Sequence, residues 1–376
     1  MDRSAAHARA RRIVQLVARG EATSRSELAE VLGIAPSTVG IAVQDLVDAG
    51  LLGETGSGPS RGGRRPRALA VPEQRGEVLS VDLGGGHARI GRLTLAGTLV
   101  DSVSFPVALV DGPEATLSAV VDACRGMSAG ALHGVGVSLP GPVDTALGGV
   151  ERPSRMPGWA GFPVGGYLAD RLGVPVAVEN DANLAALGEH RLRFGDGLHS
   201  ITVKAGTAIG AGVVVDGRLH RGATSAAGDI THTCIETGAG VACACGNVDC
   251  LETVASGAGL VRQLREAGYE VTSTAEVLAL ALDADPLASR LVRQAGTYLG
   301  QVLSVVVNFF NPHAVFLTGS LSSSEPFIAA VRGRVYASCH PLVTQTLTIE
   351  AARSGADAIL LGAANLVLDH HEVAPL

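Results

Sequence analysis

One short segment, residues 232–252, constrains the fold of this chain more than any other, because it holds a histidine and three closely spaced cysteines. His232 is followed by Cys243, Cys245 and Cys250, and Glu252 comes two residues after the last cysteine. One imidazole nitrogen and three thiolates complete the tetrahedral ligand set of a structural zinc site. The fold must therefore bring these four side chains together, and we predict a structural Zn²⁺ there.

Disulfide bonds are the alternative use of the six cysteines. The chain opens without an apolar signal segment and has no run of eighteen apolar residues, so we expect a cytoplasmic protein with no membrane partner. In a reducing compartment clustered Cys and His favour metal binding over disulfides. Cys234 lies two residues from His232 and competes with it for the fourth ligand position, where we favour His232. Cys124 and Cys339 are isolated and are expected to be buried small hydrophobes.

The charge distribution divides the chain into a basic arm and an acidic body. The net charge of the 376 residues is −7, which argues against a protein that coats nucleic acid over its whole surface. Residues 1–70 nevertheless hold ten Arg and seven acidic residues, a net charge of +3, whereas the remainder carries −10. The hydrophobic content of 47% is enough for two or three packed domains.

The basic arm has the pattern of three short helices. Apolar residues between positions 13 and 17 predict an amphipathic first helix over residues 7–19. Ser24 and Ser26 can cap a second helix that runs through Leu32 and ends at Gly33. Pro36 suits the first turn of a third helix. The tight turn over residues 32–39 is typical of a helix-turn-helix.

Residues 56–67 predict a wing or linker after these helices, because they are too rich in Gly, Pro and Arg to continue a helix. Arginines on such a scaffold remain available to phosphates or to a narrow minor groove. An ordinary three-helix domain that packs on the body is the alternative, and the wing disfavours it. We therefore expect double-stranded DNA as a partner. The candidate DNA-binding residues are Ser37, Thr38, Gln44, Arg61, Arg64, Arg65 and Arg67.

Beyond residue 70 the sequence is typical of an α/β body. Strand-like apolar runs at 78–82, 135–138, 174–178 and 314–318 alternate with helical segments. Glycine-rich turns at 82–86 and 206–212 recur after strands and suggest two related lobes; the second lacks the G-x-G-x-x-G spacing of a dinucleotide site. We predict a DNA-binding domain at 1–70, a first lobe at 71–190 and a second lobe at 191–355 that holds the zinc site. A C-terminal helix within 356–376 is expected to return to the first lobe.

The chain resembles the ROK family, which groups repressors and sugar kinases. The resemblance covers nearly the whole chain and rests on a set of motifs in a fixed order. These are Arg64-Arg65-Pro66 after the helix-turn-helix, Asp82-Leu-Gly84-Gly85, Leu139-Pro-Gly141-Pro-Val-Asp144, Glu179-Asn180-Asp181-Ala-Asn183, Gly228-Asp229-Ile-Thr-His232, and the run from Cys243 to Glu252. The resemblance implies a winged helix-turn-helix followed by a two-lobed body with the actin-like sugar kinase (ribonuclease H-like) fold.

For the sugar side, the resemblance implies roles for five residues. Asp181 matches the general base that takes a proton from a sugar hydroxyl, although its position at the start of a helix also suits an N-cap. Asn180 and Glu252 match sugar-binding residues. His232 matches a histidine that contacts a sugar hydroxyl through one ring nitrogen and zinc through the other. Asp229 stands where the family usually has Glu, and Thr231 replaces a Gly, so the usual glucose or N-acetylglucosamine preference does not transfer.

On the nucleotide side the sequence departs from the family pattern. The first phosphate turn has Gly86 in place of Thr and is followed by His87, which removes a hydroxyl donor. The second has Ala208 in place of Gly, where a close backbone approach or a positive φ would be expected. The adenosine-side Gly-Gly is Gly319-Ser320. The vestigial nucleotide-binding residues are Asp82, Gly84, Gly85, Gly206, Thr207 and Gly319.

These departures favour a sensor over an enzyme. The leading hypothesis is a cytoplasmic transcriptional regulator, a repressor by resemblance, that binds an operator and responds to a sugar or sugar derivative. It is expected to be a homodimer or homotetramer, since recognition helices must meet successive major grooves. Ligand binding between the lobes would change their closure and the spacing of the DNA-binding arms. The alternatives are an ATP-dependent, hexokinase-like sugar kinase with Asp181 as base and Asp82 positioning magnesium, and a scaffold whose pocket binds nothing.

Overall fold

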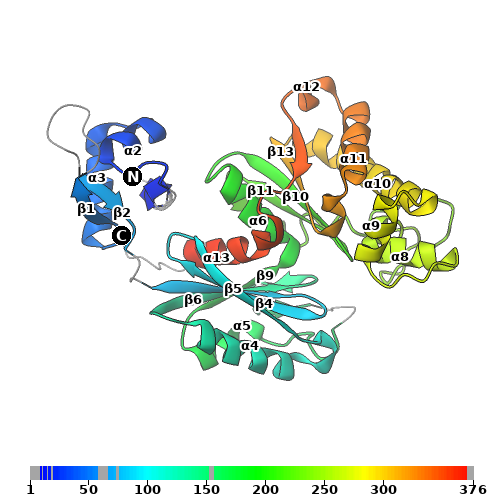
Figure 1. Ribbon diagram of the computed structural model, residues 1–376, viewed down its shortest axis with the longest axis horizontal. Helices are drawn as coiled ribbons and strands as arrows, with labels where there is room; N and C mark the ends of the chain where they lie inside the picture. Colours follow the sequence, from blue (N-terminus) through cyan, green and yellow to red (C-terminus); the bar gives the residue numbers. More distant parts are fainter. Residues whose placement is uncertain are drawn as a thin grey trace. The chain divides into compact units, whose positions relative to one another are not determined.

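The computed structural model describes residues 9–10, 12–14, 16–17, 20–57, 67–72, 76–151 and 156–370. Two compact units make up the chain: the first comprises residues 1–179 and 363–376, and the second residues 180–362. Figure 1 shows the elements of each unit coloured along the sequence. Among the described residues no single helix is long and apolar enough to span a membrane, and only the bent α2–α3 pair meets such a test jointly.

The N-terminal part of the first unit contains helices and a two-stranded sheet around a core of its own. Residues 9–10, 12–14 and 16–17 are helical. They are followed by α2 (Arg25–Leu32), α3 (Pro36–Asp48), β1 (Gly53–Ser57) and β2 (Arg67–Ala70). Buried Ile13, Leu28, Val43 and Leu69 belong to this core. The three helical segments and β2 each contribute an apolar side chain, and Leu52 adds one just before β1, so the arm can fold around its own core.

Local capping explains where α2 and α3 begin and end. Ser24 caps α2 by accepting a hydrogen bond from the Glu27 backbone N–H, and Gly33 ends the helix with a left-handed φ of 63°. Pro36 occupies the first turn of α3. The two helix axes differ in direction by 120°, a value typical of a helix-turn-helix. The cap is Ser24 and not the alternative Ser26.

The larger part of the first unit is built on a five-stranded sheet with the order β5-β4-β3-β6-β9. Its strands are β3 (Glu77–Leu83), β4 (His87–Thr94), β5 (Leu99–Pro106), β6 (Leu132–Leu139) and β9 (Val176–Asn180). Strands β3, β4 and β5 form an antiparallel meander, while β3 and β6 are parallel. A small hairpin is formed by β7 (Val143–Asp144) and β8 (Gly149–Val150), and a 3₁₀ turn, η1 (Leu109–Asp111), precedes α4.

The second unit repeats this strand order as β12-β11-β10-β13-β14. The strands are β10 (His199–Ala205), β11 (Ile209–Val215), β12 (Arg218–Leu219), β13 (Ala314–Thr318) and β14 (Thr348–Ala351). Again the first three are antiparallel and the first pairs in parallel with the fourth. The two glycine-rich turns join equivalent strands, β3 to β4 and β10 to β11. The prediction of two related lobes in an α/β body is therefore confirmed.

Helices cover both faces of the first sheet (Figure 1). On one face α4 (Pro113–Met127) and α5 (Val164–Leu172) bury Leu79, Val81 and Leu83, which alternate along β3. On the other face lies the second half of α13 (Ala358–His370). There a Cβ added to Gly136 of β6 would lie 2.2 Å from the carbonyl oxygen of Ala363. Glycine in β6 thus permits the helix to approach the sheet closely.

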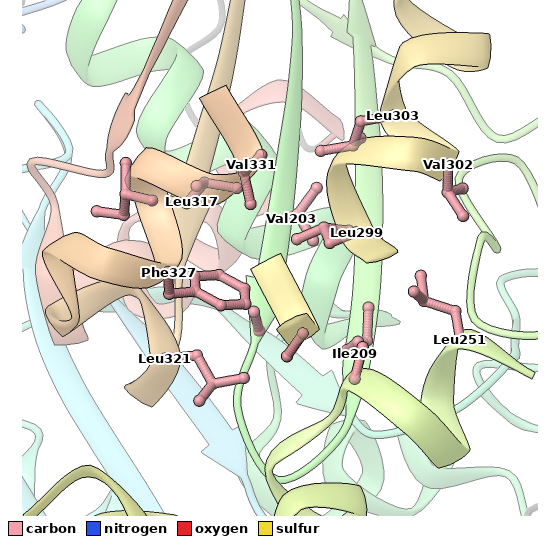
Figure 2. Close-up of a cluster of buried hydrophobic side chains, with 14 of the residues drawn as sticks. Val203, Ile209, Leu251, Leu299, Val302, Leu303, Leu317, Leu321, Phe327 and Val331 are labelled. Atoms are coloured by element: carbon pink, nitrogen blue, oxygen red, sulfur yellow. The ribbon is translucent and has the colours of Figure 1, made fainter. Parts of the chain in front are cut away.

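The second sheet buries its main core under the long helix α10 (Pro286–Phe310) and α11 (Glu325–Ser338). Figure 2 shows Val203 and Leu317 of the sheet meeting Leu299 and Phe327 of these helices. The shorter helices α7 (Leu251–Ala255), α8 (Gly257–Glu266) and α9 (Thr274–Leu282) extend the same core. The remaining elements are α12 (Pro341–Thr344), η2 (Ser320–Ser323) and η3 (Gly355–Asp357).

The opposite face of the second sheet is covered by α6 (Asp181–Arg193). A Cβ on Gly212 of β11 would lie 2.6 Å from the Ala186 Cβ, so this helix sits directly on the strand. The predicted boundary at residue 190 placed α6 in the first lobe, whereas the compact units divide between residues 179 and 180. The difference arises because α6 packs on β10 and β11.

The C-terminal helix contributes to both units. Its first turns pack on α6, where a Cβ on Gly362 would lie 1.9 Å from the Leu184 carbonyl oxygen, and its later turns pack on β6. A helix within residues 356–376 was predicted to return to the first lobe. The division into units places residues from 363 onward in the first unit and the preceding residues of the helix in the second. Residues 371–376 lie outside the described residues.

Candidate functional site

The four predicted metal ligands come together in the second unit. His232, Cys243, Cys245 and Cys250 each offer one ligand atom, and these atoms all lie within 4.8 Å of one another. The His232 Nδ1 lies 3.5 Å from the Cys243 Sγ, and the Cys245 Sγ lies 3.6 Å from the Cys250 Sγ. A zinc ion with Zn–S bonds of about 2.3 Å requires ligand separations of about 3.8 Å. The donor set and its spacing therefore fit one tetrahedral ion.

Tight turns and hydrogen bonds hold this cluster in place. The Cys243 N–H donates to the Asn247 carbonyl and the Gly246 N–H to the Cys243 carbonyl. Gly246 has a φ of 94°, which a residue with a Cβ rarely adopts. Asp249 accepts hydrogen bonds from the Gly240 and Val241 N–H groups at 3.1 and 2.7 Å. These contacts order the ligand loop from both ends.

The protonation behaviour of the thiols also fits a cation. Burial raises the pKa of the Cys250 thiol to about 12, so a thiolate there needs a positive partner. A hydrogen bond from the Asn247 backbone lowers the pKa of Cys245. Metal binding deprotonates such thiols because the ion stabilises the thiolate.

His232 and not Cys234 belongs to the four-residue cluster. Cys234 is exposed, and its backbone pairs with that of Cys250 in an isolated antiparallel bridge. Cys124 and Cys339 are buried, as expected. Because the His232 Nδ1 faces the thiols, the other ring nitrogen, Nε2, is the one that can meet a ligand.

Glu252 is positioned between the metal cluster and the hairpin of the second sheet. Leu251 is buried in the core and fixes α7 (Figure 2), so that Cys250 and Glu252 flank an anchored residue. The Glu252 Oε2 accepts a hydrogen bond from the Ile209 N–H at 2.8 Å. The hydroxyl of Thr231 donates to the Ile209 carbonyl at 2.9 Å, and the Thr231 N–H donates to Asp229. One residue of β11 thereby joins the segments that carry Asp229, His232 and Glu252.

Asn180 and Asp181 lie where β9 passes into α6. The N-cap is Asn180, whose Oδ1 accepts from the Ala182 and Asn183 N–H groups at 2.9 and 3.2 Å. Asp181 is the first residue of the helix, so the N-cap alternative for Asp181 was wrong by one position. Its Oδ1 accepts from the Ala182 N–H at 2.8 Å. The helix dipole favours a carboxylate at this position.

The structure adds one residue that the sequence analysis missed. The Nζ of Lys204 lies 2.5 Å from the Asp181 Oδ2, and the two side chains are 34% and 17% exposed. Lys204 is on β10 directly across from Gly210 of β11. The only sequence signal that could have identified Lys204 was its position in a strand just before the second glycine-rich turn.

The two glycine-rich turns differ in their surroundings. In the first unit, the turn that follows Asp82 includes Gly84 and Gly85, and the His87 ring would lie 2.6 Å from a Cβ on Gly84. In the second unit, the carbonyls of Gly206 and Thr207 accept from the Gly257 and Ala258 N–H groups. Ala208 does not adopt a positive φ, whereas Gly319 does, with a φ of 85°. The first turn is therefore partly covered by an imidazole.

A cavity of about 810 Å³ lies beside the second turn, within the second unit. Thr207 and Ser320 line it together with Arg262 and Arg265 of α8. Arg262 is paired with Glu266 at 2.7 Å. Of the predicted nucleotide-binding residues, Thr207 lines the cavity, and Ser320 follows Gly319 directly in the chain.

Within the N-terminal part, α3 presents a polar face. Ser37 and Gln44 are exposed and Thr38 is half-buried, while Val39, Val43 and Leu46 face the core. The Gln44 amide donates to Asp48 at 2.8 Å, so a base contact would have to replace this bond. Ile41 is 67% exposed on the same helix. The predicted Arg61, Arg64 and Arg65, and the side chain of Arg67, lie outside the described residues.

Strand β1 is fixed to α2. Arg25 of α2 and Glu54 of β1 form an ion pair at 2.7 Å. The Leu69 N–H of β2 donates to the Thr23 carbonyl at 2.7 Å. The hairpin is thus held against the helix that precedes the turn.

Comparison with known proteins gives consistent similarities. A model described as "ROK family" matches residues 78–370. The chain is 30% identical over 356 residues to a xylose repressor from Bacillus spizizenii, covering 92% of this chain and 91% of that protein. It is also 30% identical to a glucokinase from Halalkalibacterium halodurans, but over 77% of this chain. A solved ROK family transcriptional regulator, a homologue of the E. coli MLC protein, superposes with a TM-score of 0.76 at 25% identity over 97% of both chains.

Proposed function

The chain belongs to the ROK family, and from this premise we propose that it is a sugar-responsive transcriptional repressor that binds double-stranded DNA. One observation carries the proposal: an N-terminal part with its own core, in which α2 and α3 cross at 120° and a β-hairpin follows. That geometry suits a recognition helix in a major groove with a wing beside it. The similarity to repressors extends through this part, whereas the similarity to the glucokinase covers less of the chain.

The DNA-binding surface is proposed to include α3 and the wing. Ser37, Thr38 and Gln44 of α3 can reach base edges or phosphates, and the exposed methyl groups of Ile41 can meet a thymine methyl. The arginines Arg61, Arg64, Arg65 and Arg67 would supply the phosphate contacts. Two copies of the chain are expected per operator, because half-sites on one face of DNA recur each helical turn.

The ligand site is proposed to lie in the second unit around Asn180, Asp181, Asp229, His232 and Glu252. Carboxylates accept hydrogen bonds from sugar hydroxyls, and the imidazole Nε2 can accept or donate one. The Ile209 N–H and Thr231 hydroxyl hold neighbouring residues of this set in position. The ligand must bind the DNA-competent and released arrangements with different affinities to act as an effector.

Zn²⁺ is proposed as the structural metal of the His232, Cys243, Cys245 and Cys250 cluster. When bound there, it neutralises thiolate charge and fixes the tautomer of the His232 ring. The protein itself orders the ligand loop through Asp249 and anchors α7 through Leu251. Its chemistry is structural because all four positions are filled by protein side chains.

The test of the regulator proposal uses DNA selected by the full-length protein from a random double-stranded library. Fluorescence anisotropy should give specific binding that falls steeply with salt, as counterion release requires. Adding D-xylose, D-glucose or N-acetyl-D-glucosamine in turn should change the affinity for that DNA with at least one sugar. Failure to select any sequence would contradict the proposal.

A sugar kinase is the second candidate, favoured by the retained Asp181 beside Asn180 and by the glucokinase similarity. Phosphoryl transfer depends on positioning and on charge stabilisation in the phosphate turns. The His87 ring over Gly84 and the Cβ of Ala208 disfavour that role. Sugar-dependent ATP turnover that disappears in Asp181→Asn would establish the kinase instead.

A further inference from the structure

Lys204 is the only lysine in the chain, and its ammonium contacts Asp181. The Lys204 Nζ and the Asp181 Oδ2 lie 2.5 Å apart, so the ammonium donates a charge-assisted hydrogen bond to the carboxylate. Lys204 remains 34% exposed, so part of its surface is open to a second partner. This ion pair therefore lies within the proposed ligand site without being closed off from it.

The alternation of β10 explains why Lys204 reaches Asp181. Ser200, Thr202 and Lys204 share the face of β10 that α6 covers, while Ile201 and Val203 enter the core on the opposite face. Near the far end of α6, the His190 Nδ1 and Ser200 Oγ lie 2.7 Å apart. The same register sets Lys204 against the first residue of the helix. The contact is thus determined by strand pairing and not by a flexible loop.

The neighbouring turn connects this ion pair to the remaining ligand residues. Lys204 pairs with Gly210, and a Cβ on Gly210 would lie 3.0 Å from the Ala182 Cβ, which places the hairpin tip against the start of α6. The adjacent Ile209 N–H is the donor to Glu252. Asp181 and Glu252 are therefore held at one end of the same β10–β11 hairpin.

The charge of this group disfavours an anionic ligand. Asp181, Asp229 and Glu252 supply three carboxylates of the proposed site, and Lys204 supplies one ammonium that is already paired. A phosphate or carboxylate group offers only acceptors, so at these positions it would be repelled by the carboxylates and could donate no hydrogen bond to them. An uncharged polyol brings donors to each carboxylate at no electrostatic cost.

We propose that the Asp181–Lys204 pair recognises a hydroxyl of an uncharged sugar, and that Lys204 is a specificity-determining residue of the site. A hydroxyl can donate to the carboxylate and accept from the ammonium at the same time. Neither a phosphate nor an apolar substituent can satisfy both partners. The effector is accordingly a neutral, unphosphorylated sugar, an inference that rests on the proposed function.

The Asp181–Lys204 pair also explains how Asp181, which matches a general base, can bind a sugar hydroxyl without removing its proton. The Lys204 ammonium is hydrogen-bonded to the Asp181 Oδ2. A general base needs a carboxylate oxygen that can take the proton of the attacking hydroxyl. Here the ammonium competes for that oxygen, so the hydroxyl is bound and its proton is retained.

The test is calorimetric titration of the full-length, zinc-loaded protein. The probes are D-xylose, D-glucose and N-acetyl-D-glucosamine, compared with D-glucose 6-phosphate, N-acetyl-D-glucosamine 6-phosphate and D-glucuronate. The variants are Lys204→Met, which removes the charge at similar length, and Lys204→Arg, which retains it. Arg171→Met is the matched control, because it removes one positive charge from an exposed position on α5 in the first unit.

We expect wild type to bind one neutral sugar at least tenfold more tightly than its anionic counterparts. Lys204→Met should reduce the affinity for that sugar tenfold or more, and Lys204→Arg should reduce it less. Arg171→Met should bind the sugar with wild-type affinity. Preference for a phosphate or glucuronate, wild-type affinity in Lys204→Met, or no binding of any probe would overturn the inference. Binding of the selected DNA is measured on the same preparations: if it persists, only the ligand inference fails, and if wild type binds no DNA, the proposed function fails.

Discussion

The two five-stranded sheets share one strand order, but their glycine-rich turns have very different surroundings. In the first unit the turn after β3 carries His87 over Gly84. In the second unit the turn after β10 is flanked by Lys204, and Glu252 binds the Ile209 N–H beside it. The fold thus supplies two turns at equivalent places in the strand order, and the side chains around each turn set its chemistry.

The metal cluster makes the largest difference between the two units, and its removal should have the largest effect. Cys250→Ser is expected to abolish zinc binding and to unfold the segment 232–252, since structural zinc sites contribute about 10 kcal/mol of apparent binding free energy at neutral pH. Elemental analysis and hydrogen exchange would measure both. Cys234→Ser is the control, because this exposed cysteine lies next to the cluster but outside it. One zinc per chain in Cys250→Ser would refute the ligand assignment.

Acid should destabilise the units in different pH ranges. Burial lowers the pKa of His190 in the second unit to about 4 from 6.5. His190 therefore binds a proton more tightly in the unfolded chain than in the folded one. Its full contribution to the free energy of unfolding is present above pH 6.5 and should be lost as the pH falls to about 4. The loss is about 3 kcal/mol, from about 1.4 kcal/mol per pKa unit. Hydrogen exchange of β10 would measure it, and His190→Gln should remove the dependence.

Glu77 provides the contrasting group in the first unit. Burial alone would raise its pKa, but hydrogen bonds from Ser128, Ala129 and Gly130 and the charge of Arg92 lower it below 4.5. Its contribution is present above pH 4.5 and is lost only as the pH falls through the lowered folded-state value. Fluorescence of the buried Trp159, the only tryptophan, follows this unit. Coincident acid transitions of β10 and Trp159 would contradict the distinction.

The shared helix α13 should make the two units equally sensitive to a single added methyl group. Gly188→Ala and Gly136→Ala each place a Cβ against its backbone, 2.0 Å from the Ala358 oxygen and 2.2 Å from the Ala363 oxygen. Each should lower the free energy of unfolding by about 1–3 kcal/mol. Gly126→Ala in α4, with open space around its Cβ, should instead raise it by about 0.5–1 kcal/mol. Urea titration would compare the three variants, and a Gly126→Ala variant as destabilised as the other two would argue against close helix contacts at Gly188 and Gly136.

Substitutions near the two glycine-rich turns should differ in their effect on sugar affinity, and this difference in binding free energy should be small. Glu252→Gln weakens the charge-assisted bond to the Ile209 N–H and should reduce sugar affinity about tenfold, or about 1.4 kcal/mol. His87→Ala, at the equivalent turn of the first unit, should leave sugar affinity unchanged. Calorimetry with the sugar that wild type binds would decide. A larger loss in His87→Ala would reverse the assignment of the ligand to the second unit.

Much of this arrangement could be predicted from local sequence. Gly33 and Pro36 set the limits of α2 and α3 because their backbone preferences act within one or two residues. The spacing of His232 and the three cysteines predicted a single metal cluster. The recurring glycine turns predicted related lobes, and the repeated strand order confirms them.

Other features could not be predicted because they depend on contacts distant in sequence. The assignment of α6 to the second unit follows from its packing on β10 and β11, which begin after the helix has ended. The cap at Asn180 instead of Asp181 depends on where β9 ends. Element boundaries shift by one or two residues without any change in the local pattern.

The sequence by itself determined the α/β class, the arm with its helices and the set of side chains able to hold a metal. Each of these follows from composition, spacing or backbone preference within a short stretch. Only the tertiary structure decided that Lys204 meets Asp181, 23 residues away. That contact arises because the face of β10 is fixed by its pairing with β11 and β13 and by the helix that covers it, and none of these is encoded next to the lysine.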